Sequence, residues 1–146
     1  MFFFNSGIAD TAVDILRGEG WSRYSFRNVD IDNEGHGFER AVVRCETPAY
    51  AKGFLNIDRL EVSKAGKSCA LIELVDHAEG GPWHPQRIEA RHLDCYSQDH
   101  GVVLRVDGPG WHGNVDTSLI KPPHLEYTGK TGATSVKLIS ERPFKQ

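Results

Sequence analysis

The fold is constrained most by a succession of short runs in which apolar and polar residues alternate, separated by turns rich in Gly, Pro and Asn. Residues 38–46, 53–63 and 102–107 follow this alternation. Residues 69–75 are apolar on both faces apart from Glu73, which is typical of a strand in the centre of a sheet. From the spacing of such runs we expect about seven to nine strands.

One segment near the start of the chain has a different periodicity. Its apolar residues fall at helical spacing, and they are Ile8, Ala12, Ile15 and Leu16. This stripe predicts a short helix over residues 6–17, with Asn5 or Ser6 as its cap and Gly18 at its end. A helix this short must pack its apolar stripe on another element to be stable.

The segment that follows changes the face on which its apolar residues lie. Tyr24 and Phe26 share one parity, whereas Val29 and Ile31 share the other. Because a regular strand keeps its apolar residues on one face, this change predicts a β-bulge or bend near Asn28.

Together these patterns predict an α+β fold that is mainly β, in a single domain over residues 1–146. The chain is long enough to bury a core without a disulfide or a metal. We expect the one N-terminal helix to be followed by mostly antiparallel strands that form a sandwich or a partly open barrel. The helix would cover an edge or an open end, and the alternative is a single curved sheet wrapped on it.

Charge and cysteine content narrow the class of protein. The net charge is −3 and is spread evenly between the halves of the chain, which argues against a general nucleic-acid binder without excluding a local basic patch. No apolar run approaches the roughly 20 residues that span a bilayer, so no membrane association is predicted. Three scattered cysteines and no export signal predict core thiols in a reducing compartment, the cytoplasm.

Seven histidines raise the question of a metal site. The candidate ligands are His84, His92, Cys95 and His112. His92 and Cys95 are three residues apart, and residues at that spacing in a strand point to opposite faces. No CxxC or HExxH motif is present, so we predict neither a metal nor another cofactor.

The same histidines are the candidates for acid–base chemistry. His84, His92, His100 and His112 are available, with Asp94 or Asp99 to orient one of them. No GxSxG nucleophile elbow occurs, and the sequence leaves the catalytic residues unassigned. A small hydrolase or nuclease that uses histidine, with or without a metal, is therefore an alternative hypothesis.

Two tryptophan–histidine pairs follow Gly and Pro residues and are predicted to lie in loops. They are Trp83-His84 and Trp111-His112. Indole rings on loops at one end of a rigid β-domain would form a recognition surface. Otherwise both rings fold back and close the ends of the core.

Arginines recur at spacings that bring them onto one face. Arg87, Glu89 and Arg91 share a strand face by parity, which predicts an exposed ladder of charged side chains. Arg17, Arg23 and Arg27 can also lie near one another. An anion site at these positions is the alternative interpretation.

These observations support three functional hypotheses. The first is a non-catalytic binding domain that engages a protein or a small ligand through Trp83, His84, Trp111 and His112. The second is the histidine-based hydrolase or nuclease. The third is a structural or assembly subunit whose exposed edge strands pair with a partner, in an oligomeric state that the sequence leaves open.

Overall fold

The computed structural model describes most of the chain as β-strand. The described residues are 2–4, 9–16, 20–32, 36–47, 51–76, 86–96, 100–107, 111–120, 125–128 and 135–139. These residues contain no helix, and so no helix long and apolar enough to cross a membrane occurs among them.

The strands form two sheets. Sheet A has six strands in the order β1-β3-β5-β7-β9-β11, namely Phe2–Phe4, Gly20–Asp32, Ala51–Val62, Gln86–Cys95, Trp111–Asp116 and Ser135–Ile139. Sheet B has five strands in the order β10-β8-β6-β4-β2, namely Leu125–Thr128, His100–Asp107, Gly66–Asp76, Phe38–Thr47 and Ala9–Leu16. Every pair of neighbouring strands in both sheets is parallel.

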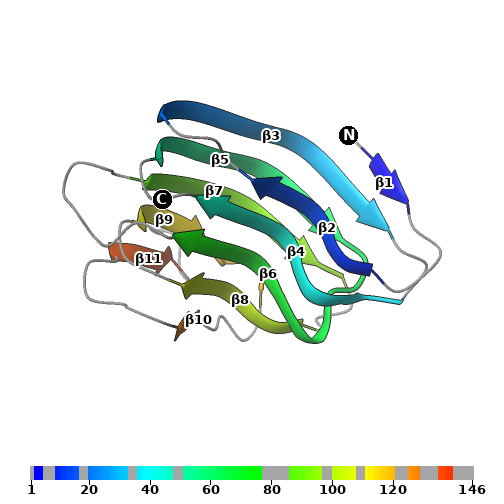
Figure 1. Ribbon diagram of the computed structural model, residues 1–146. Helices are drawn as coiled ribbons and strands as arrows, with labels where there is room; N and C mark the ends of the chain where they lie inside the picture. Colours follow the sequence, from blue (N-terminus) through cyan, green and yellow to red (C-terminus); the bar gives the residue numbers. More distant parts are fainter. Residues whose placement is uncertain are drawn as a thin grey trace, which may run out of the picture.

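Consecutive strands alternate between the two sheets. The chain runs along sheet A in one direction, turns, and returns along sheet B in the opposite direction (Figure 1). Each turn of the chain therefore adds one strand to each sheet, which is the architecture of a flattened parallel β-solenoid. In such a coil, equivalent positions stack on one another, as Val29, Leu60 and Leu93 do.

The predicted N-terminal helix is wrong. Residues 9–16 form strand β2, which pairs with β4 and places Val13 opposite Val43 and Ile15 opposite Cys45. The run is compatible with both periods, because Thr11, Val13 and Ile15 also alternate. A helix of this length gains little stability by itself, whereas the strand gains a ladder of hydrogen bonds and buries Ile15.

The predicted antiparallel sandwich or barrel is also wrong, because all strand pairs are parallel. The alternation of side chains indicates which face of a strand is buried but not which strand lies beside it. Residues 63–65 connect β5 of sheet A to β6 of sheet B, so these two successive strands are not paired as a hairpin.

The predicted bend near Asn28 is confirmed, and it recurs in the next two strands of sheet A. Asn28, Arg59 and His92 have φ angles of 51°, 66° and 56°, in the left-handed region that few residues adopt. The three positions stack, because the residues on either side of each are paired across the sheet. We call Asn28, Arg59 and His92 the bend row. It lets each strand keep its apolar side chains inward after the change of parity.

The core lies between the two sheets. Its largest fully buried side chains include Trp111, Leu55, Ile57, Leu74 and Leu104. The three cysteines Cys45, Cys69 and Cys95 are buried free thiols, as predicted. The outward side chains of each sheet are consequently displayed in rows on a rigid support.

Candidate functional site

The outer face of sheet A, turned away from sheet B, displays its side chains in rows that cross the strands. Before the bend row, outward residues on each strand alternate with buried ones such as Leu55 and Ile57. The first row is Arg23, Phe54, Arg87 and His112. The second row is Ser25, Asn56, Glu89 and Asn114. The third row contains Arg27, Asp58 and Arg91.

The ladder predicted on β7 is confirmed by an ion pair. Arg87 Nη2 lies 2.9 Å from Glu89 Oε1, and both side chains face outward. The amide of Asn114 on the next strand donates to the same Glu89 oxygen over 3.3 Å. Glu89 is thereby held between β7 and β9 with part of its carboxylate still open to solvent.

A hollow of about 200 Å³ lies on this face between β5 and β7. It is lined by Phe54, Asn56, Glu89, Ala90 and Arg91. The hollow therefore combines an aromatic ring, an amide, a carboxylate and a guanidinium. This is the mixture of one apolar surface and a few converging polar groups that is typical of small-ligand sites.

The Phe54 ring is itself held in place from one side. The Arg23 guanidinium lies over the ring at 5.2 Å from its centroid, a cation–π contact. Strand β3 therefore places the Arg23 guanidinium against Phe54, a lining residue of the hollow, although Arg23 does not itself line the hollow.

An aspartate–histidine pair lies at the edge of the same face. His92 Nδ1 is 3.0 Å from Asp58 Oδ1, and Arg91 Nε is 3.3 Å from the same oxygen. The hydrogen bond from His92 is the largest cause that lowers the pKa of Asp58. Burial opposes it, and the charge of Arg91 acts in the same direction as His92. The sequence predicted that Asp94 or Asp99 orients a histidine, whereas the residue that contacts His92 is Asp58.

Beyond the bend row the same face is acidic. Asp30, Glu61 and Asp94 form a row there, and Arg59 Nη2 lies 3.2 Å from Asp30 and 2.9 Å from Glu61. The hydroxyl of Tyr96 donates to Glu61, and this bond raises the pKa of Tyr96. The bend row thus divides an arginine-rich part of the face from a carboxylate-rich part.

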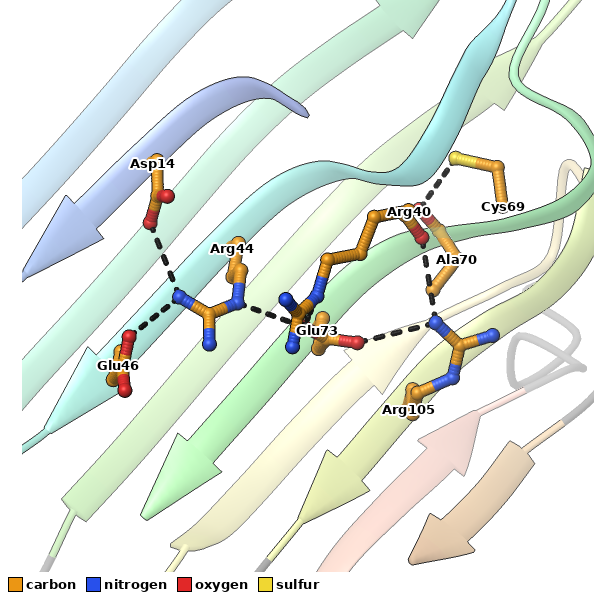
Figure 2. A network of polar contacts seen from close by, with 8 residues as sticks. All are labelled: Asp14, Arg40, Arg44, Glu46, Cys69, Ala70, Glu73 and Arg105. Carbon is orange, nitrogen blue, oxygen red and sulfur yellow. Dashed lines mark hydrogen bonds and ion pairs between the residues drawn. The ribbon is translucent and has the colours of Figure 1, made fainter. Parts of the chain in front are cut away.

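The outer face of sheet B contains a network of a different kind. Glu73 accepts hydrogen bonds from Arg40 over 2.7 Å, Arg44 over 2.9 Å and Arg105 over 3.1 Å (Figure 2). Arg44 also contacts Glu46 at 2.6 Å. Burial by itself would raise the pKa of Glu73, but the bonds from Arg105, Arg40 and Arg44 outweigh it and hold that pKa below its ordinary value. The network therefore supplies the buried Glu73 carboxylate with three guanidinium donors.

The tryptophan–histidine pairs lie differently from the prediction. Trp111 is the first residue of β9 rather than a loop residue, and its side chain is fully buried in the core. Its Nε1 has no hydrogen-bond partner within the described part of the chain. His112 points outward in the first row, beside Arg87. Trp83 and His84 lie outside the described residues, so their part in binding remains a prediction.

The proposed metal ligands are not brought together where the structure describes them. His92 lies on the outer face, whereas Cys95 is buried in the core. No group of three or more His, Cys, Asp and Glu residues suited to a metal occurs among the described residues. His84 and Asp99 lie outside the described part, and of His100 only the strand position is described.

Comparison of the chain with protein-family models, curated proteins and solved structures found no match. The candidate site therefore rests on the geometry of the outer face of sheet A.

Proposed function

We propose that the protein is a non-catalytic binding domain that takes an oligosaccharide on the outer face of sheet A. The observation that carries this proposal is the hollow between β5 and β7, with its aromatic, amide, carboxylate and guanidinium lining. It keeps the binding role predicted from sequence but moves the contact surface from tryptophan loops to a sheet face.

The lining suits the two kinds of surface on a sugar ring. The apolar C–H face of a sugar packs against an aromatic ring, a role that Phe54 can fill. Sugar hydroxyls both donate and accept, so they can donate to Glu89 and accept from Asn56 or Arg91. A simple apolar ligand could pack against Phe54 but would leave the polar groups of Asn56, Glu89 and Arg91 without hydrogen-bond partners.

The rigid support also favours a chain of sugar units. Rows of outward side chains continue beyond the hollow to His112 and Asn114 on β9. A ligand longer than one sugar can therefore contact successive strands of the same sheet. Because the strands are fixed by parallel ladders and a buried core, little ordering is needed on binding.

Calorimetric titration with a panel of neutral and acidic oligosaccharides tests the proposal. Phe54→Ala should weaken binding of the best ligand by about tenfold, since an aromatic contact of this size is worth roughly 0.5–1.5 kcal/mol or more. Tyr96→Ala removes an exposed ring beyond the bend row and serves as the matched control. Equal losses in the two variants, or no binding by any member of the panel, would overturn the proposal.

A second candidate function, hydrolysis of the bound ligand, is favoured by the Asp58–His92 pair. His92 would take a proton from water as the water oxygen bonds to the sugar carbon and the glycosidic C–O bond breaks. The leaving sugar oxygen would take a proton from solvent water, and His92 would return its own proton to solvent. New reducing ends should then form with the wild-type protein and not with His92→Gln. Identical rates for the two proteins would exclude the second candidate.

The thiols bear on the location of the protein. Cys45, Cys69 and Cys95 are buried thiols that form no disulfide, which suits a reducing compartment. They support the cytoplasmic location that we propose from the sequence.

A further inference from the structure

We infer that the oligosaccharide is acidic, with carboxylate or sulfate groups that bind four arginines around the hollow. This inference rests on the proposed function and names the chemistry of its ligand. The four residues are Arg23, Arg27, Arg87 and Arg91, which we call the arginine frame.

The strand register sets the shape of the arginine frame. Arg23 and Arg87 both align with Phe54, one from β3 and one from β7. Arg27 and Arg91 align in the same way with Asp58. The Cα atoms of Arg23 and Arg87 are two strand spacings apart, about 10 Å, and so are those of Arg27 and Arg91. Along one strand, four residues separate the two arginines, which places their Cα atoms about 13 Å apart.

The hollow lies inside this frame. Phe54 and Asn56 belong to the central strand β5, and Glu89 lies between Arg87 and Arg91 on β7. A sugar ring over Phe54 would therefore have guanidinium groups on both sides. Arginine matches carboxylate and sulfate well, because its planar group donates two parallel hydrogen bonds.

The balance of charge within the frame is positive. No carboxylate among the described residues forms an ion pair with Arg23 or Arg27, and both are exposed. On β7 the arginines project further than their partners: the side chains of Arg87 and Arg91 are 53% and 62% exposed, against 31% for Glu89. A ligand that approaches this part of the face meets guanidinium groups first.

The carboxylates inside the frame favour an acidic sugar over a nucleic acid. Asp58 and Glu89 can each accept a hydrogen bond from a sugar hydroxyl, whereas a phosphodiester group has no donor to offer them. Binding of single strands normally uses several aromatic rings, whereas the hollow supplies one. An acidic oligosaccharide offers both the anionic groups and the hydroxyl donors that the frame requires.

The acidic row beyond the bend limits where such a ligand lies. Asp30, Glu61 and Asp94 repel anionic groups, and Arg59 offsets only part of their charge. Repulsion at this boundary adds specificity to the attraction within the frame. The ligand should consequently occupy the first three rows and stop at the bend row.

Calorimetry with an oligogalacturonate and a neutral cello-oligosaccharide of equal length tests the inference. At low salt the wild-type protein should bind the acidic ligand at least about tenfold more tightly, and added salt should reduce this preference. The double variant Arg23→Gln with Arg27→Gln should bind the acidic ligand about tenfold less tightly and the neutral ligand with unchanged affinity. Arg23→Lys with Arg27→Lys retains the charge but not the planar group, and should lose less affinity for the acidic ligand than the double Gln variant. Lys67→Gln, an exposed charge on β6, controls for net charge.

The outcomes separate the inference from the function on which it rests. Equal affinity for the two sugars would overturn the inference and leave the binding domain standing. Binding of neither sugar would overturn both. Tighter binding of an oligothymidylate than of the oligogalacturonate, lost in the double Gln variant, would replace the acidic sugar with a nucleic acid. A loss with Lys67→Gln equal to that of the double Gln variant would also overturn the inference.

Discussion

Both outer faces of the molecule carry contacts between arginine and a carboxylate, but these contacts have different roles on sheet A and on sheet B. On sheet B, Glu73 is buried and three arginines surround it, so that its side chain is only 4% exposed. On sheet A, Glu89 and Asp58 each lie beside one arginine of β7, and a hollow remains open between the strands. Both faces carry arginine–carboxylate contacts at similar distances.

The difference shows that the number of partners and the burial decide what such a contact does. A buried carboxylate must have every lone pair satisfied, because an unpaired buried charge is costly. The Glu73 network therefore holds β4, β6 and β8 together (Figure 2). Exposed pairs contribute little to stability, and so the groups on sheet A remain available to a ligand.

The largest expected effect is on stability. Glu73→Ala should reduce the free energy of unfolding by about 3–5 kcal/mol, because it removes the buried carboxylate that Arg40, Arg44 and Arg105 share and leaves their positive charges close together. Glu89→Ala should cost no more than about 1 kcal/mol. Urea denaturation of both variants measures this. Equal losses would show that the two faces do not differ as described.

Acid should reveal the same contrast. Because the folded-state pKa of Glu73 is below its ordinary value, its ionised form stabilises the fold at higher pH. That contribution is lost as the pH falls through the folded pKa. The difference in unfolding free energy between wild type and Glu73→Gln should therefore be largest near neutral pH and shrink in acid. A constant difference across the range would contradict this assignment.

Substitutions on sheet A should change binding without changing the fold. Arg91→Gln should weaken binding of the acidic oligosaccharide by about tenfold, because it removes a bidentate donor from the frame. The free energy of unfolding should change by less than about 0.5 kcal/mol, since the side chain is exposed. Calorimetry and urea denaturation on the same sample separate the two effects, and a large loss of stability would count against an exposed binding role.

The smallest expected effect is on the pKa of one side chain, Asp58. Replacing His92 with Gln removes the hydrogen bond that contributes most to the lowered pKa of Asp58. That pKa should rise toward its ordinary value, because burial then opposes the remaining contacts with Arg91. Carbon NMR of the Asp58 carboxyl group during an acid titration measures the shift. An unchanged pKa would show that the Asp58–His92 pair does not persist in solution.

Part of this structure could be predicted from the sequence because it depends only on neighbouring residues. The bend at Asn28 follows from the change of parity between Phe26 and Val29, and the ladder of Arg87 and Glu89 follows from their spacing. The alternation over residues 38–46 and 102–107 likewise predicted strands that the structure contains as β4 and β8.

The rest depends on register between residues far apart in the chain. Asp58 and His92 meet because β5 and β7 are parallel neighbours, a relationship that alternation within each strand does not indicate. The charge of the chain is spread evenly in sequence, yet stacking gathers arginines on one side of the bend row and carboxylates on the other. Trp111 was assigned to a loop because Gly and Pro precede it, although it begins a buried strand.

The central claim is that the hollow on sheet A, and not the network on sheet B, is the ligand site. An amide NMR titration of the wild-type protein with the oligogalacturonate tests it most directly. The account predicts that the largest shifts occur at Asn56, Glu89, Ala90 and Arg91. Shifts centred on Glu73 and Arg105, or none at any concentration, would contradict it.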